Sequence, residues 1–129
     1  MNELVNPPKV HRPGGAYTHT VSVPSGALWL AISGQIGVKP DGKIAGDFKR
    51  QAEQAFRNVL ACLRAHRMGK ADLVKLTVFL TDPRHVEAYR AARKRVLGDD
   101  TRPASTLLIV DGLASPDFLI EVEGWAAKA

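Results

Sequence analysis

The sequence contains very few of the residues that build disulfide frameworks or metal centres. Its single cysteine, Cys62, cannot form an intramolecular disulfide, which fits a reducing compartment. Cys62 also falls in an apolar helical stretch, where a buried, inert thiol is expected rather than a nucleophile. The four histidines are scattered, and the glycines form neither a P-loop nor a dinucleotide fingerprint. We therefore expect no metal site and no nucleotide cofactor.

Long apolar runs are missing as well. Met1–Val10 contains no apolar core of a signal peptide, and no run approaches the roughly 20 residues that a membrane-spanning helix needs. The 129 residues, 45% hydrophobic and 24% charged, have the ordinary composition of a globular chain. The sequence thus predicts a single cytoplasmic domain over residues 1–129, with residues 1–16 forming an extended arm rich in Pro and Gly.

Aromatic residues make up only 6% of the chain, which bears on the net charge of +5. Much of the positive charge gathers in Arg90, Arg93, Lys94 and Arg95, on one predicted helix. No aromatic side chains interleave with these bases, so no platform for stacking nucleobases is visible. The pattern favours a solvated basic helix face over a nucleic-acid interface.

Hydrophobic periodicity predicts two helices. The first begins after an N-cap at Asp47 and runs to about His66, with Gly69 as its stop signal. The second covers His85–Leu97 and ends at Gly98. Its apolar stripe is the weaker of the two, and one side of it carries Val86, Tyr89, Arg93 and Val96.

Five strands complete the prediction, with a short sixth near Lys43–Ile44. They are expected at Tyr17–Val23 and Leu28–Ser33, joined by a hairpin turn at Pro24-Ser25-Gly26, and at Leu73–Thr81, Ser105–Val110 and Phe118–Ala126. The order β-β-α-β-α-β-β predicts an α+β fold of two layers, with both helices on one face of the sheet. Since the sheet carries apolar residues on both faces, a homo-oligomer is expected to cover the second face.

The stretch RPASTLLIVDGLASPDFLIEVEGWA, from Arg102 to Ala126, holds the most specific pattern. Its last strand alternates, so that Glu121 and Glu123 share one face with Leu119 and Trp125. Two acidic residues on one strand face are often a plain solvated edge. The apolar neighbours favour a partly covered cleft or a subunit interface, where a carboxylate is hydrogen-bonded, neutralised or functional.

This stretch closely resembles the C-terminal signature of the RidA family, also called YjgF/UK114 or L-PSP endoribonuclease. The resemblance lies in the string P-A-S-T, an apolar strand, G-L-A-x-P and then (L/I)-E-(V/I)-E-x-x-A. Further segments are similar in the same order along nearly the whole chain: His11–Val21, Ile32–Ile36, Gln51–Leu63 and Ala71–Asp82.

The resemblance implies a chorismate-mutase-like subunit with a mixed sheet, assembled as a homotrimer around a central barrel. It implies small-molecule ligand clefts between neighbouring subunits. Many family members hydrolyse reactive enamines and imines such as 2-aminoacrylate to keto acids and ammonia, without a cofactor. We expect a small-molecule hydrolase of this type.

The resemblance also points to individual residues. Glu123 corresponds to the family's second strand glutamate, which orients water or substrate, and Tyr17 to its cleft tyrosine, so these two are the candidate catalytic residues. Ser33 and Gly34 correspond to cleft-lining residues whose backbone meets the ligand. The alternatives are a structural carboxylate, a core tyrosine and an ordinary strand end. Glu121 is interpreted as a structural or interface residue.

The departure from the family pattern is Ser105, which stands where deaminating members carry an arginine that binds the substrate carboxylate. A serine offers one neutral donor in place of a charged fork, which argues against the usual 2-imino acids as substrates. Arg102 lies three residues away and is expected to point to the other face, so Arg90 is the better candidate for a replacement clamp.

Two further functions therefore stay open beside the hydrolase. The first is a non-catalytic trimer that binds a metabolite. The second is an RNA-directed endoribonuclease or translation inhibitor that uses the basic residues 90–95, which predicts a strongly salt-dependent affinity for RNA.

Overall fold

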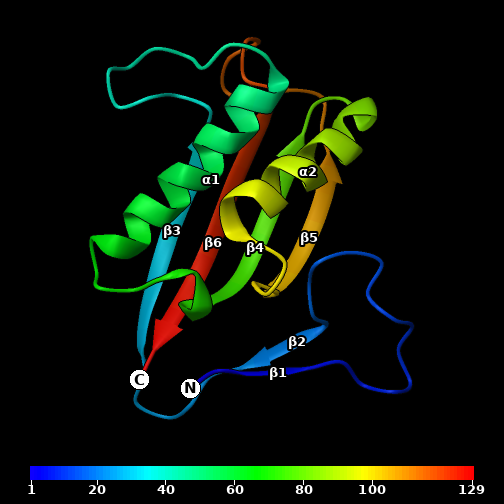
Figure 1. The fold of residues 1–129 in the computed structure, drawn as a ribbon, viewed down its shortest axis with the longest axis vertical. Coiled ribbons are helices and arrows are strands. Elements are labelled where there is room, and N and C mark those ends of the chain that lie inside the picture. The colour runs from blue at the N-terminus through cyan, green and yellow to red at the C-terminus, as the bar shows by residue number, and fades with distance from the viewer.

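The computed structural model describes residues 1–129, and its helices lie on one face of a four-stranded sheet (Figure 1). The sheet contains β3 (Leu28–Ile36), β4 (Leu73–Leu80), β5 (Ala104–Ile109) and β6 (Ile120–Lys128), in the order β3-β6-β4-β5. β4 and β5 are parallel, and the other pairs are antiparallel. The predicted α+β class, with a mixed sheet and both helices on one face, is confirmed.

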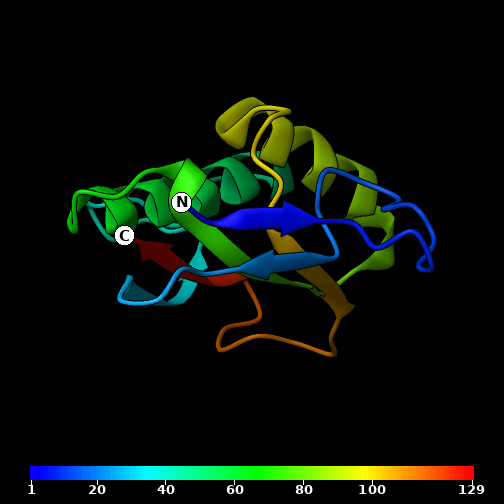
Figure 2. The same cartoon turned by 90° about the horizontal axis from the view of Figure 1, so that it is seen from below.

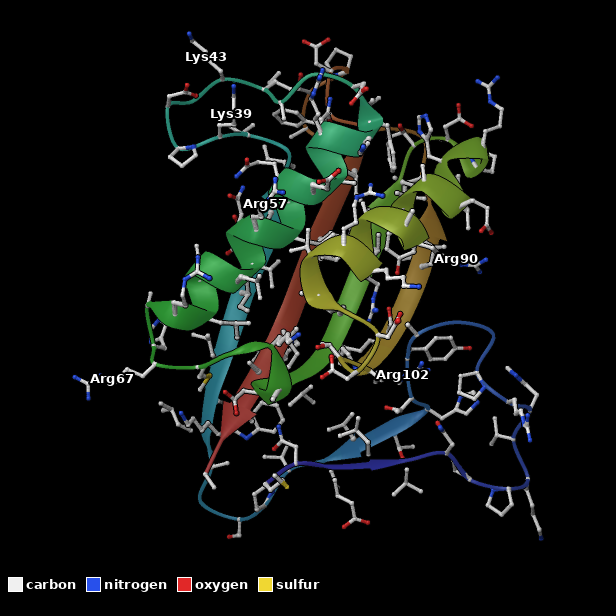
Figure 3. The ribbon with its side chains drawn as sticks, in the orientation of Figure 1. Lys39, Lys43, Arg57, Arg67, Arg90 and Arg102 are labelled. Atoms are coloured by element: carbon white, nitrogen blue, oxygen red, sulfur yellow. The ribbon has the colours of Figure 1, made fainter.

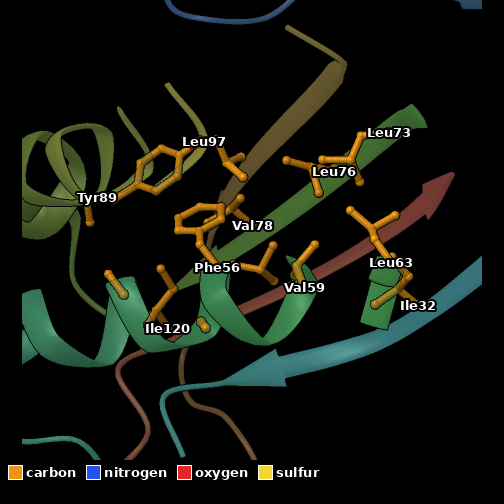
Figure 4. Close-up of a cluster of buried hydrophobic side chains, with 14 of the residues drawn as sticks. Ile32, Phe56, Val59, Leu63, Leu73, Leu76, Val78, Tyr89, Leu97 and Ile120 are labelled. Atoms are coloured by element: carbon orange, nitrogen blue, oxygen red, sulfur yellow. The ribbon is translucent and has the colours of Figure 1, made fainter. Parts of the chain in front are cut away.

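The first helix, α1 (Phe48–Arg64), begins as the sequence predicts. Asp47 is its N-cap, and the carboxylate accepts a hydrogen bond from the amide of Arg50 at 3.0 Å. The apolar stripe of α1 packs on β3 and β6 and against α2, with Phe56, Val59 and Leu63 fully buried (Figure 4). The predicted stop at Gly69 is wrong: the helix ends at Arg64, and a short 3₁₀ turn (Lys70–Asp72) precedes β4.

The second helix, α2 (Val86–Leu97), follows a 3₁₀ turn at Pro83–His85 and connects the parallel strands β4 and β5. Gly98 ends it with φ +80°, a conformation that only glycine adopts without strain. The inward face of α2 contributes Tyr89, Ala92 and Leu97 to the core, and it also buries Arg93. None of the helices is both long and apolar enough to cross a membrane.

The N-terminal region differs from the prediction. The arm contains a strand, β1 (Glu3–Val5), which pairs with β2 (Thr20–Ser22) in a separate two-stranded sheet. Figure 2 shows this pair crossing one end of the main sheet. The turn at Pro24–Gly26 exists, with Gly26 at φ +81°, but β2 and β3 belong to different sheets and form no hairpin. A turn sequence specifies a reversal of the chain and leaves the strand partners open.

One smaller expectation is also corrected, because near Lys43–Ile44 the chain forms only an isolated bridge between Val38 and Ile44. The two C-terminal strands, β5 and β6, are separated in the sheet by β4. The sheet face opposite the helices stays open in the single chain and carries exposed apolar side chains, among them Trp29 at 51% and Trp125 at 49%.

Candidate functional site

A cavity of about 400 Å³ lies where the N-terminal arm, α2 and β5 meet. Its wall includes Tyr17, which directly follows the arm, Tyr89, Arg90 and Arg93 from α2, and Ser105 and Leu107 from β5. Three residues that the sequence proposed from separate segments, Tyr17, Arg90 and Ser105, are thus brought to one place. Figure 3 shows Arg90 on α2 and Arg102 before β5, both on the side of the molecule where the arm lies.

Thr18 attaches the arm to β5. Its amide donates to the carbonyl of Pro103 at 3.2 Å, and its hydroxyl donates to the carbonyl of Arg102 at 3.0 Å. The side chain of Thr18 is buried, and its backbone forms a parallel bridge with Ala104. Because Tyr17 directly precedes this anchor, its ring is held in the cavity wall beside the first residues of β5.

The cavity contains two tyrosines in different environments. The hydroxyl of Tyr17 accepts a hydrogen bond from the amide of Gly14 at 3.3 Å, so its own O–H remains available as a donor. Burial raises the pKa of the Tyr89 phenol, while the charge of Arg93, a hydrogen bond with Ser105 and the charge of Arg90 act in the opposite direction. Tyr89 is therefore a neutral hydrogen-bonding group at neutral pH.

Arg93 is the cavity residue that the sequence interpretation missed. It is 4% exposed, and its Nη2 donates to the carbonyl of Thr101 at 2.7 Å. Burial lowers its pKa, Tyr89 raises it and Arg102 lowers it, but an arginine remains protonated across the physiological range. The signal in the sequence was its position on the inward stripe of α2, because charged residues are rarely buried unless they have a partner.

The other basic residues of α2 are exposed and paired with acids. Arg90 Nη1 lies 2.6 Å from Glu87 Oε1, and Arg95 Nη2 lies 3.1 Å from Glu53 Oε2. Figure 3 shows that Lys39, Lys43, Arg57 and Arg67 are distributed over α1 and the loops at its two ends. With one arginine of the 90–95 run buried and others paired to carboxylates, the run offers little free charge for an RNA backbone.

The remaining predicted residues lie together elsewhere, at a β-bulge. The pairing of β3 with β6 shifts between Ile32 and Gln35, so that Ser33 and Gly34 lie opposite Glu123. A Cβ atom at Gly34 would overlap the side chain of Glu121, because this side chain lies directly against the glycine backbone. Ser33 and Glu123 are exposed, whereas Glu121 is half-buried.

The cavity and the bulge lie on opposite faces of the sheet. Ser105 faces α2 across the cavity, whereas Glu123 lies on the face away from the helices, because its neighbours Ile120 and Val122 are in the core. β6 and β5 are also separated by β4, which puts them about 10 Å apart. Within one chain, Glu123 and Ser105 do not form a single site.

No group of three or more His, Cys, Asp or Glu side chains is placed to hold a metal ion. Cys62 is only half-buried, contrary to the expectation of a buried thiol.

Comparisons with known proteins give a consistent picture. A family model described as endoribonuclease L-PSP matches residues 9–128. The RutC family protein PH0854 of Pyrococcus horikoshii is 31% identical over 130 residues, covering 99% of both chains. TdcF of Escherichia coli, named as a proposed reactive intermediate deaminase, is 29% identical over 119 residues, covering 91% of this chain and 92% of its own.

Two solved structures are similar over nearly the full length. The Rid family protein YyfB from Yersinia pestis superimposes with a TM-score of 0.89 at 26% identity, covering 98% of each chain. E. coli TdcF with bound serine superimposes with a TM-score of 0.74 at 26% identity, covering 98% of this chain and 99% of its own.

Proposed function

This chain belongs to the endoribonuclease L-PSP (RidA) family, and from that premise we propose that it is a cofactor-free small-molecule hydrolase of the enamine/imine deaminase type. The observation that carries the proposal is the cavity, into which the fold brings Tyr17, Arg90 and Ser105 from three separate segments. The similarity to TdcF, named as a proposed deaminase, supports the same class of reaction.

The reaction requires few groups. Water adds to the imine carbon, a proton reaches the nitrogen, and the C–N bond breaks to release ammonia and leave a carbonyl. The hydroxyl of Tyr17 is placed to donate a hydrogen bond to substrate or water, since it accepts one from Gly14. Ser105 adds a hydroxyl to the wall of the same cavity.

We propose that a second copy of the chain supplies the carboxylate, within a homotrimer. Glu123 and the bulge at Ser33–Gly34 lie on the open face of the sheet, so they cannot reach the cavity of their own chain. The exposed rings of Trp29 and Trp125 on this face support its burial in an assembly. In the assembly, Glu123 orients the water in the neighbouring cleft.

Glu121 is a second carboxylate for this role, because its side chain packs over Gly34. The variants Glu121→Gln and Glu123→Gln separate the two candidates. The carboxylate that orients water is expected to lower kcat at least about tenfold when it is neutralised, whereas a structural one changes thermal stability instead. If neither substitution lowers kcat, the role of a strand carboxylate is refuted.

The hydrolase proposal is tested with 2-iminopropionate generated in situ, together with an imine that lacks a carboxylate. Wild type, Tyr17→Phe and Ser105→Arg are compared, with Arg67→Gln as a control because Arg67 is exposed on the loop after α1. Turnover by the wild type and the control, reduced in Tyr17→Phe, supports the proposal. A wild-type rate equal to that of buffer on every imine refutes it.

A second candidate is a non-catalytic metabolite-binding protein, which Ser105 in place of the family arginine favours. It keeps the cavity and loses the charged fork at this position. Stabilisation by small metabolites in thermal-shift measurements, without any turnover, supports this candidate. Activity only in Ser105→Arg indicates a competent cleft that serves a different ligand.

A further inference from the structure

One arginine in the cavity wall lacks the acidic partner that buried cations normally have. Arg93 is 4% exposed and lines the cavity, yet it takes part in none of the ion pairs of the molecule. Its Nη2 donates to the carbonyl of Thr101, and its Nη1 is buried without a hydrogen-bond partner. A guanidinium removed from water is normally held by a counter-charge, because burial of an uncompensated charge is costly.

The other charges around the cavity do not supply that counter-charge. Asp99 is the single acidic residue in the wall, and its carboxylate lies 3.6 Å from Lys94 Nζ. Arg90, also in the wall, is paired with Glu87 on the exposed side of α2. Three basic side chains against one carboxylate leave the cavity net positive, and only the buried cation has no acidic partner.

We infer that Arg93 is the anion-binding residue of the cavity and that the ligand is a small organic acid whose carboxylate pairs with it. The inference rests on the proposed function, since it names the ligand class for the same cavity. A planar guanidinium pairs well with a carboxylate, and Tyr89 and Ser105 supply neutral hydroxyls in the same wall.

This assignment explains in physical terms why position 105 carries a serine and not an arginine. An arginine at position 105 would place a second guanidinium in the cavity that Arg93 already lines, and the two like charges would repel each other. A serine avoids the repulsion and keeps a hydrogen-bonding group. The carboxylate clamp has therefore moved from β5 to α2. Arg90, the clamp suggested by the sequence, remains at the exposed rim with Glu87 as its partner.

The test measures binding of pyruvate and of its neutral amide, pyruvamide, by calorimetry. Arg93→Gln keeps an amide that can donate to Thr101 but removes the charge, and Arg95→Gln is the matched control, since Arg95 lies on the same helix outside the cavity wall. We expect the affinity for pyruvate to fall at least tenfold in Arg93→Gln and to stay unchanged in Arg95→Gln. Equal affinity of wild type and Arg93→Gln for pyruvate overturns the inference.

A double variant adds a gain of binding. In Arg93→Gln/Ser105→Arg the repulsion is absent, so the new arginine is expected to restore pyruvate binding. If Arg93→Gln does not fold, the wild type alone decides: thermal stabilisation by pyruvate beyond that by pyruvamide or chloride supports the inference, and no such difference overturns it. Turnover is scored separately. Arg93-dependent binding without hydrolysis refutes the hydrolase only, and hydrolysis that is indifferent to Arg93 refutes the clamp only.

Discussion

Two threonines in the N-terminal region can show whether the burial of a side-chain hydrogen bond or its length decides how much the bond stabilises the fold. Thr18→Val keeps the shape of the side chain but removes the hydroxyl that donates to the carbonyl of Arg102 at 3.0 Å. Because Thr18 is 6% exposed, the carbonyl loses a partner that water does not readily replace. Such a loss costs about 1–2 kcal/mol in the free energy of unfolding. For a chain of 129 residues this corresponds to roughly 3–8 °C in Tm.

Thr20→Val is the matched control. Thr20 donates to the carbonyl of Val5 over a shorter distance, 2.7 Å, but its side chain is exposed, so water can replace the lost bond. We expect a loss of about 0.5 kcal/mol or less. Thermal unfolding followed by circular dichroism measures both variants. If Thr20→Val loses as much stability as Thr18→Val, the reasoning that buried attachment holds the arm against β5 is refuted.

Further predictions concern helix packing and acid stability. Gly37→Ala would place a Cβ atom 2.5 Å from the Cα of Gln51 on α1, and we expect a loss of about 2–4 kcal/mol in urea unfolding, whereas Gly112→Ala, with open space around it, should change little. The pKa of Asp82 is lowered to about 2, first by its side-chain hydrogen bond with Arg84, so the pair stabilises the fold above pH 4 and the effect disappears as the pH falls toward 2. The Tm difference between wild type and Asp82→Asn should therefore shrink as the pH falls from 4 to 2. A difference that persists at pH 2 would contradict a stabilising role of the charged Asp82–Arg84 pair.

Local signals in the sequence located the helices well. Asp47 caps α1 and Gly98 ends α2, because both act through backbone groups within a few residues. The end of α1, predicted at about His66, lies at Arg64, but the stop signal was assigned to the wrong residue: Arg67, at φ +57°, occupies the left-handed region for which Gly69 was expected. Arginine in this conformation has no sequence signature.

The sequence predicted poorly which segments far apart in the chain contact one another. The turn at Pro24–Gly26 predicted a hairpin, yet the partner of β2 is β1. Two hydrogen bonds help to fix this pair: the amide of His19 donates to the side-chain oxygen of Asn6, and the hydroxyl of Thr20 donates to the carbonyl of Val5. The sequence identified only some of the residues that line the cavity. Tyr17 and Ser105 were chosen through a resemblance, whereas the importance of Arg93 depends on the Thr101 carbonyl and on burial, which one sequence does not show.

The strand order has a consequence for how the chain folds. β6 is the last strand in the sequence, and in the sheet it lies between β3 and β4. Its pairing with β3 brings Leu28 opposite Lys128, next to the C-terminal residue. No part that lacks β6 can build the sheet, because β3 then has no partner at all. Contacts between such distant residues must close large loops, at a cost in chain entropy, before they stabilise the fold. This cost slows folding, and it makes the N-terminal strand β3 depend on the C-terminal strand β6. The main sheet should therefore assemble in one cooperative step, with a rate set by the arrival of β6.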